Sequence, residues 1–280
     1  MFKQRKLTQR NILPGFGLSF GITLFMLSFI VLIPLSAVIF KSADLGWEGF
    51  WNAVTNRRSL AALRLSFSVS FYAACFDVAA GLLIAWVLTR YRFAGRRFFD
   101  AIVDLPFALP TAVAGIALTT LYSKNGWIGK LTYQWGWETA YSPLGIGIAL
   151  AFIGLPFVVR SVQPILAELE PEMEEAAASL GASRVSTFLK ILFPELFPAL
   201  MTGFTMAFAR ALGEYGSVVF ISGNMPLKTE ILPLLVMTQL ENYEYEKAAA
   251  LATTMLGFSF LFLLAVNLLQ RWTQQRRGMA

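Results

Sequence analysis

Long apolar runs alternate with short polar segments along most of this 280-residue chain. A membrane-spanning helix needs roughly 20 predominantly apolar residues. The apolar runs are continuous and do not alternate with polar residues, which favours helices over the strands of a membrane barrel. The pattern therefore predicts an all-α membrane protein with six transmembrane helices, at about residues 16–40, 65–88, 99–122, 144–164, 196–221 and 248–269.

Prolines in the first and third of these runs are expected to disturb the helix. Pro34 is expected to kink the first span, and Pro106 and Pro110 break the third. Two prolines four residues apart free backbone carbonyls, and irregular backbone at membrane depth is tolerated only where it is buried or lines a cavity. The third span is therefore either a lining of a pathway or a simply kinked helix.

The polar segment 165–195 has the pattern of two short helices. Pro171 can begin the first helix, and the glutamates that follow suit the positive end of its dipole. Gly181 can end this helix with a positive φ. An amphipathic helix is expected over 185–193, before Pro194 marks the entry into the fifth span. This segment either docks in a groove of a partner subunit or lies on the membrane; its acidic start favours docking, because membrane-surface helices are usually rich in Lys and Arg.

Composition and charge support a membrane protein and predict how its spans are oriented. The chain is 56% hydrophobic and 14% charged, whereas a soluble domain has about a quarter charged residues. Its net charge is +6, and the basic residues gather in short loops, which is typical of membrane orientation rather than of nucleic-acid binding. The bias places both termini and the segments 90–97 and 160–195 in the cytoplasm. We expect a first unit at 1–60 (cytoplasmic amino terminus, first span and periplasmic loop), a transmembrane core at 61–270 containing the coupling loop 165–195, and a cytoplasmic tail at 271–280.

Ionisable residues within the predicted spans are candidates for function. Arg210 and Glu214 are four residues apart in the fifth span, so they share one helix face and can pair. A charge at mid-bilayer costs roughly 2.5–3.5 kcal/mol on insertion scales, so both side chains should face protein or water. The pair could meet a passing anion or simply fix helix packing. Asp77 is expected to find a polar partner in the bundle, and Asp104, before Pro106, to cap a broken helix.

Several chemistries have no support in the sequence. There is no histidine, and the single cysteine, Cys75, lies in an apolar run where a small buried residue is expected. No phosphate-binding loop is present; the nearest candidate, at Gly129-Lys130, lacks the upstream glycine and the hydroxyl. We find no nucleophile elbow and no cluster of metal ligands. The chain is therefore not expected to be an enzyme or to bind a metal or cofactor itself.

The coupling loop also carries a family resemblance. Its spacing Glu-Ala-Ala-x3-Gly-x9-Ile-x-x-Pro, over 175–194, resembles the coupling loop of permease subunits in ATP-binding-cassette importers; Phe193 replaces the family's usual Leu. Nearly the whole chain is similar to the T-subunit family of bacterial sulfate/thiosulfate permeases, most specifically at Leu13–Phe16, Leu88–Phe93, Asp104–Gly115 and Phe208–Gly216. The third and fourth of these segments also resemble molybdate permeases.

This resemblance implies a type I importer permease fold with a cytoplasmic coupling helix in the bacterial inner membrane. It implies a homologous second permease subunit, two copies of a cytoplasmic ATPase that holds ATP and magnesium, and a periplasmic sulfate- or thiosulfate-binding protein. A permease for molybdate or another oxyanion is the alternative. A stand-alone ion-coupled transporter fits less well, because no internal repeat is visible.

Two sets of candidate site residues follow. The residues expected to couple to the ATPase are Glu174, Glu175, Ala176, Ala177, Gly181, Ile191 and Pro194. The candidates for the translocation pathway are Arg210, Glu214, Asp104, Pro106, Pro110 and Asp77.

Overall fold

The computed structural model describes residues 16–277, with side chains to residue 270. Every regular element in this part of the chain is a helix, as the sequence predicts. The basic amino-terminal segment, most of the motif Leu13–Phe16 and the arginine side chains of the carboxyl-terminal tail lie outside the described residues.

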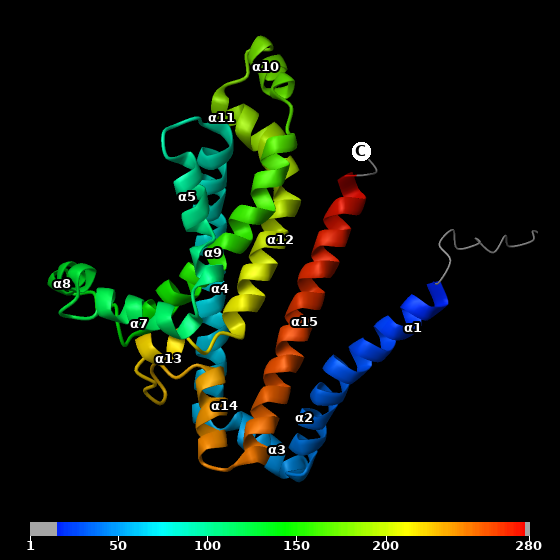
Figure 1. The fold of residues 1–280 in the computed structure, drawn as a ribbon, viewed down its shortest axis with the longest axis vertical. Coiled ribbons are helices and arrows are strands. Elements are labelled where there is room, and N and C mark those ends of the chain that lie inside the picture. The colour runs from blue at the N-terminus through cyan, green and yellow to red at the C-terminus, as the bar shows by residue number, and fades with distance from the viewer. Residues whose placement is uncertain (1–15, 278–280) are drawn as a thin grey trace, which may run out of the picture.

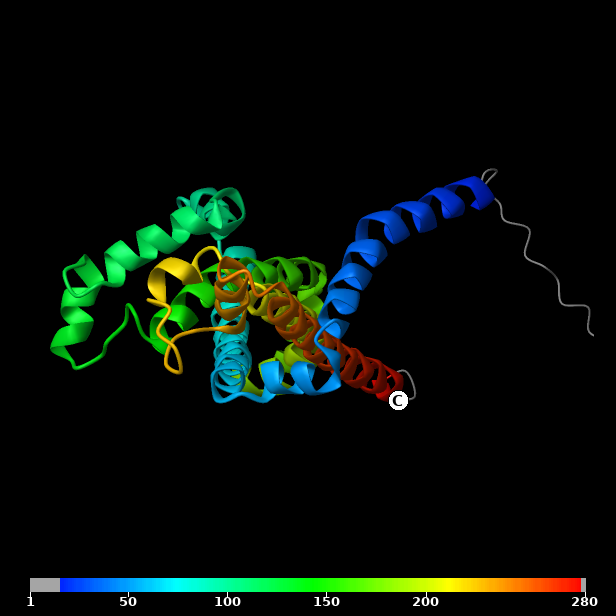
Figure 2. The same ribbon diagram turned by 90° about the horizontal axis from the view of Figure 1, so that it is seen from below.

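Five helices in the described part are long and apolar enough to cross a membrane. The first joins α1 (Phe16–Leu27), a π-helical turn (Ser28–Leu32) and α2 (Ile33–Ala43). The π turn lies directly before Pro34, and Figure 2 shows the helix bending in this region. The other four are α4 (Arg57–Arg90), α9 (Pro143–Glu168), the helix from Arg184 to Leu212, and α15 (Tyr245–Arg277), which is apolar enough as far as Gln270.

The predicted third span is a series of short helices. It consists of α5 (Arg96–Val103), α6 (Leu105–Ala108) and α7 (Thr111–Tyr122), and α8 (Trp127–Gln134) follows it. Pro106 lies in the first turn of α6, and Pro110 immediately precedes α7. Both prolines therefore stand at helix starts, where their missing N–H is tolerated.

The predicted fifth span is displaced in the structure. α11 (Arg184–Thr187), a π turn (Phe188–Leu192) and α12 (Phe193–Leu212) form one continuous helix. The expected helix break at Pro194 is absent: the widened turn lies just before this proline, whose ring would otherwise clash with the carbonyl four residues earlier. The helix ends at Leu212 and not near 221, and the short α13 (Val218–Ile221) is separate.

α4, α9 and α12 form the centre of the molecule (Figure 1). Glycines bring these helices close together around Val158 of α9. A Cβ on Gly81 of α4 would be 2.7 Å from Val158 Cγ1, and a Cβ on Gly203 of α12 would be 2.8 Å from Val158 Cα. Small residues of this kind are how membrane helices pack tightly without a hydrophobic driving force.

The remaining helices surround this bundle. Figures 1 and 2 show α1 leaning away from it on one side, and α7 and α8 extending on the other. The short α3 (Gly46–Thr55) follows the first span and carries Trp47, Phe50 and Trp51. α14 (Leu232–Glu241) packs beside the first part of α15.

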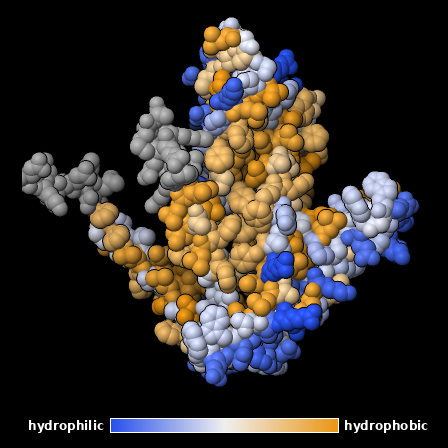
Figure 3. Space-filling view, turned by 180° about the vertical axis from the view of Figure 1, so that it is seen from behind, coloured by the Kyte–Doolittle hydropathy of each residue, from blue (hydrophilic) through white to orange (hydrophobic). Residues whose placement is uncertain are grey.

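Apolar side chains cover the middle of the outer surface. In Figure 3 a hydrophobic belt lies between two polar ends of the molecule. Leu83 and Phe260 are examples of large apolar side chains exposed in this belt, and Cys75 is also exposed, contrary to the sequence-based expectation. This distribution is the one expected of a surface that contacts lipid.

Candidate functional site

The coupling loop stands at one end of the bundle, at the top of Figure 1. Its first helix, α10, spans Pro171–Ser179, as the sequence predicts. Gly181 has φ +80°, and two hydrogen bonds close the helix end: Gly181 N–H donates to Ala178 O at 2.9 Å and Ala182 N–H to Ala177 O at 3.0 Å. This pair of bonds is the Schellman motif, which favours glycine at the position with positive φ.

Apolar side chains around α10 have no cover. Leu180 is 89% exposed, and Val185 and Leu189 are also exposed. Among the predicted coupling residues, Glu175 and Ala176 face outward, whereas Ala177 is buried against the loop. The loop therefore presents small and apolar groups to whatever lies beyond this end of the molecule.

Glu174, a predicted coupling residue, turns inward. Its Oε1 lies 3.0 Å from Nη2 of Arg90, the last residue of α4. Both atoms are shielded from solvent but not aligned as a hydrogen bond, so the attraction is chiefly Coulombic. The Arg90 guanidinium also lies 5.8 Å from the ring centre of Trp86, and Trp86 packs edge-on against Phe188. These contacts join α10 and the π turn to α4.

Ile191 and Pro194, the last predicted coupling residues, lie within the continuous helix rather than in a loop. Ile191 belongs to the π turn, and Pro194 occupies the first turn of α12. Both are partly buried. They therefore lie in the helix that connects the coupling loop with the membrane interior, and not on its outer tip.

Arg210 and Glu214 form a charge centre where α12 ends. Arg210 Nη1 donates to Glu214 Oε2 at 2.5 Å, as their spacing predicts. Glu214 is 2% exposed, and its Oε1 accepts hydrogen bonds from the backbone N–H and hydroxyl of Ser217, at 2.8 and 2.9 Å. The Arg210 side chain is 33% exposed. Among the described residues, its Nη1 has a hydrogen-bond partner, and Nε and Nη2 have none. The carboxylate is thus satisfied, and part of the cation remains accessible.

The broken third span packs against this centre. A Cβ on Gly115 of α7 would lie 2.5 Å from Ser217 O, and a Cβ on Gly216 would lie 2.2 Å from Oγ1 of Thr111. These two glycines therefore allow α7 to approach the segment that follows α12. Pro110 immediately precedes α7. Two segments far apart in the sequence, 111–115 and 216–217, therefore meet at one place.

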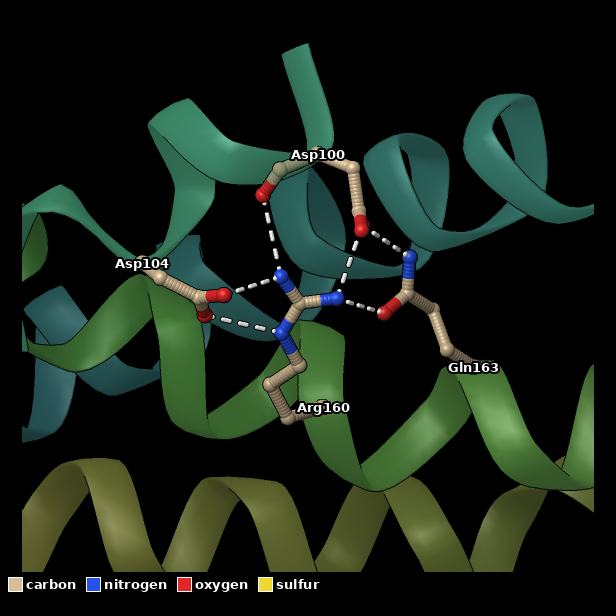
Figure 4. A network of polar contacts seen from close by, with 4 residues as sticks. All are labelled: Asp100, Asp104, Arg160 and Gln163. Carbon is tan, nitrogen blue, oxygen red and sulfur yellow. Dashed lines mark hydrogen bonds and ion pairs between the residues drawn. The ribbon is translucent and has the colours of Figure 1, made fainter. Parts of the chain in front are cut away.

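Asp104 lies elsewhere, in a polar network on α9 (Figure 4). It stands at the cap position of α6, but its side chain makes no capping hydrogen bond. Instead Arg160 donates from Nε to Asp104 Oδ1 at 2.8 Å and from Nη2 to Oδ2 at 2.5 Å. Arg160 Nη1 also donates to Asp100 Oδ1 at 2.7 Å and to Gln163 Oε1 at 2.5 Å. The network fixes α5 and the start of α6 to α9.

Asp77 does not find the expected polar partner. It is buried in α4, and its Oδ1 has no hydrogen-bond partner among the described residues. A Cβ on Gly154 of α9 would lie 2.1 Å from Asp77 Oδ2, and Ala207 of α12 is adjacent to the same glycine. The carboxyl group thus occupies the space that Gly154 leaves at the centre of the bundle. It is not hydrogen-bonded to Arg210 or Glu214.

Arg90 and Arg160 are the residues that sequence reasoning missed. Both were counted only as charges that orient the membrane. Their partners are 84 and 56 residues away in the chain, respectively. An Arg near the end of an apolar run is the available signal for each of them, and it does not identify a partner.

Solved structures with the same fold are importers. A bacterial ABC transporter involved in the import of the acidic polysaccharide alginate matches with a TM-score of 0.74 over 91% of this chain and 95% of that chain, at 14% identity. A chain of the MetNI methionine ABC transporter in inward-facing conformations matches with a TM-score of 0.57 over 76% of this chain and 95% of that chain, at 17% identity. At these identities the likeness concerns the fold, which is that of an ABC importer permease.

The sequence comparisons identify the family. The family model described as "Binding-protein-dependent transport system inner membrane component" matches residues 77–278, and the chain belongs to this family. Its relatives include the "Sulfate transport system permease protein CysT" of Salmonella typhimurium, 47% identical over 94% of this chain and 95% of the relative. The proteins of the same name from Escherichia coli and Synechocystis are 46% and 44% identical over 94% and 96% of this chain, and over 95% and 94% of the relatives. The protein is thus a multi-span permease subunit of an ABC importer and not itself an enzyme.

Proposed function

We propose that this permease subunit carries sulfate or thiosulfate into the cell. The observation that carries the proposal is the identity of 44–47% with sulfate permease subunits, which extends over nearly the full length of each chain. The accessible part of the Arg210 guanidinium supports it, because a planar fork of donors suits an oxyanion.

The pathway is proposed to pass the charge centre at the end of α12. An oxyanion that reaches Arg210 would bind N–H groups that Glu214 leaves unused, while Glu214 neutralises the guanidinium when the pathway is empty. Pro110, which precedes α7, and the approach of α7 at Gly115 would form part of the same lining. Pro106 lies apart from it, in an apolar groove between α4, α5 and α9. Asp77 and Asp104 are assigned to helix packing instead, since neither is joined to Arg210.

Coupling is proposed to run through the helix from Arg184 to Leu212. Its 29 residues span roughly 43 Å at about 1.5 Å per residue. One end carries the coupling loop, and Arg210 stands near the other end. We infer that α10 docks in a groove of an ATPase subunit by its exposed Glu175, Ala176 and Leu180, so that closure of the ATPase tilts this helix and, through Glu174 and Arg90, α4.

The assembly follows from this arrangement. We propose a homologous second permease subunit, two copies of a cytoplasmic ATPase that bind ATP and magnesium, and a periplasmic sulfate- or thiosulfate-binding protein. The proposed location is the bacterial inner membrane, with α10 and both termini in the cytoplasm. In support, the basic turn 91–97, the coupling loop and the end of α15 lie at the same end of the bundle in Figure 1.

Uptake in a deletion strain tests the substrate. Without the gene, growth on sulfate and on thiosulfate as sole sulfur source should fail, and the wild-type gene should restore it. Uptake of radiolabelled sulfate should also require a functional ATPase subunit. If sulfate uptake is unaffected and molybdate uptake is lost, the proposed substrate is wrong but the protein is still an importer subunit. Uptake without an ATPase would contradict the importer function itself.

A further inference from the structure

Ion pairs neutralise some of the cations of this molecule and leave others exposed. At the end that carries α3 and the start of α15, several cations are neutralised by nearby carboxylates: Lys41 by Asp44 and Glu246, Arg58 by Glu230, and Lys247 by Glu244. The Arg58–Glu230 pair is bidentate, with N–O distances of 2.7 and 2.6 Å. Arg57 and Arg64, in the first turns of α4, are exposed at this end and make no ion pair within the described residues, so the neutralisation is partial.

The turn between α4 and α5, at the coupling-loop end, gathers several exposed cations around one cavity. Arg92, Arg96 and Arg97 are exposed, and within the described part of the chain none of them is in an ion pair. Together with Phe93 and Gly95 they line a cavity of about 350 Å³. Gly95, with φ +86°, makes the sharp turn that brings the arginines on its two sides to one cavity.

An apolar groove begins directly beneath these arginines. Its volume is about 550 Å³, and Phe93 lines both it and the basic cavity. The Phe93 and Phe99 rings are 6.0 Å apart at the boundary between the two. Further along, α4, α5 and α9 contribute its walls, with side chains that include Leu83, Val87, Ile102, Phe152 and Leu155.

The Arg160 network determines which face of α5 lines this groove. Asp100 and Asp104 are both turned toward Arg160 (Figure 4). The groove therefore receives Phe99, Ile102 and Val103 from α5, and its whole lining is apolar. The result is a long apolar channel in the lipid-exposed belt with a basic cavity at its end.

We propose that an anionic phospholipid binds here, with its phosphate on Arg92, Arg96 and Arg97 and one acyl chain in the groove. Guanidinium groups suit phosphate oxygens, and basic pockets at the ends of membrane helices bind anionic head groups. Charge complementarity selects this occupant: Arg96 feels the charge of Asp100, but none of the three arginines is in an ion pair among the described residues. A zwitterionic lipid would bring no net counter-charge to them, and neither would a purely apolar helix from another subunit.

Photolabelling of the full importer tests the proposal. The purified complex is placed in vesicles of phosphatidylglycerol or phosphatidylcholine that carry the same photoactivatable acyl chain, and the labelled residues are mapped. Phosphatidylglycerol should label Leu83, Phe99 and Ile102 severalfold more than phosphatidylcholine. Each single Arg→Gln change should weaken phosphatidylglycerol binding about fivefold, and the triple variant R92Q/R96Q/R97Q should show no preference between the lipids.

The double variant R184Q/K190Q is the matched control, because it removes two exposed cations from the same end but away from the groove; it should keep the preference. I102W, which fills the groove and leaves the arginines in place, should abolish labelling of Leu83. Inorganic phosphate should not displace the lipid. Equal labelling by the two lipids, a preference that survives in the triple variant, or crosslinks to the second permease subunit in place of lipid would overturn the proposal.

Discussion

At the scale of single residues, the partner of each ionisable side chain decides its role. Arg210 and Glu214, four positions apart on one helix face, are joined by a bond of 2.5 Å. Asp104 pairs with Arg160 and makes no capping bond, and Asp77 Oδ1 has no hydrogen-bond partner among the described residues. A helix repeat fixes which residues four positions apart meet, but nothing local determines how α5 lies on α9.

The accessible guanidinium of Arg210 gives the first prediction. R210A should lower sulfate uptake at least tenfold at an unchanged amount of protein in the membrane, because the oxyanion loses its donors. R210K should retain part of the activity, since it keeps the charge but not the planar fork. Radiolabelled uptake, normalised by immunoblot, measures both. Normal uptake in R210A and also in E214A would show that the pair is not part of the pathway.

Backbone geometry at Gly181 gives a second prediction. Its φ is +80°, and a Cβ there would meet nothing within 4 Å, so a substitution acts through backbone strain of about 1–2 kcal/mol and not through a clash within this chain. G181N should therefore retain more transport than G181A, and G181V the least, because Asn tolerates the left-handed region. Uptake assays on the three variants check this order; equal uptake by G181V and wild type would contradict it.

At the scale of helices, the length of the apolar runs predicts most of the long helices. The prolines predict a break at the start of the fifth span that the structure does not have. The runs in the first, second, fourth and sixth spans correspond to long helices. Pro106 and Pro110 mark real breaks, yet the helix continues past Pro194 and Pro198. A π turn before Pro194 absorbs the local conflict, and the sequence gives no sign of it. The continuity matters, because it connects the coupling loop rigidly to Arg210.

The contact between Arg90 and Glu174 gives a prediction at this scale. Arg90 and Glu174 are 3.0 Å apart in the native protein. R90E or E174R alone replaces this attraction with a repulsion and should uncouple the importer, so that ATP hydrolysis persists while uptake falls severalfold. The double variant R90E/E174R restores opposite charges and should recover most of the uptake. The measurement is uptake per ATP hydrolysed in reconstituted vesicles.

E172Q is the control for that cycle, because Glu172 is an exposed carboxylate on the same helix. Its ratio of uptake to hydrolysis should stay within about twofold of the wild type. Failure of the charge swap to recover any uptake, with both single variants impaired, would mean that the pair does not transmit movement.

At the scale of the whole molecule, the sequence predicts the class of protein but not the arrangement of its helices. Hydropathy predicts an apolar belt, and Figure 3 displays one between polar ends. Three glycines allow α4, α9 and α12 to pack closely around Val158 and Asp77. The sequence does not predict this, because the role of each glycine depends on which residue of another helix faces it. The lateral extension of α7 and α8 is likewise decided by tertiary packing.

Orientation is testable by cysteine labelling. In a C75S background, a cysteine at Ser179 of α10 should react with a membrane-impermeant maleimide only after the cytoplasmic side is opened. A cysteine at Trp47 of α3, which is 76% exposed, should react in intact spheroplasts. The reverse pattern would invert the proposed topology.

The central claim is that α10 is held by a separate ATPase, and a site-specific crosslink tests it most directly. A photoreactive amino acid at position 180, where the native Leu180 is 89% exposed, should join this chain to the ATPase subunit in membranes, and the yield should change when ATP is bound. The same probe at Phe260, on the lipid-exposed belt, should not join the two proteins. Crosslinking of position 180 to lipid alone, with no ATPase adduct in any nucleotide state, would contradict the account.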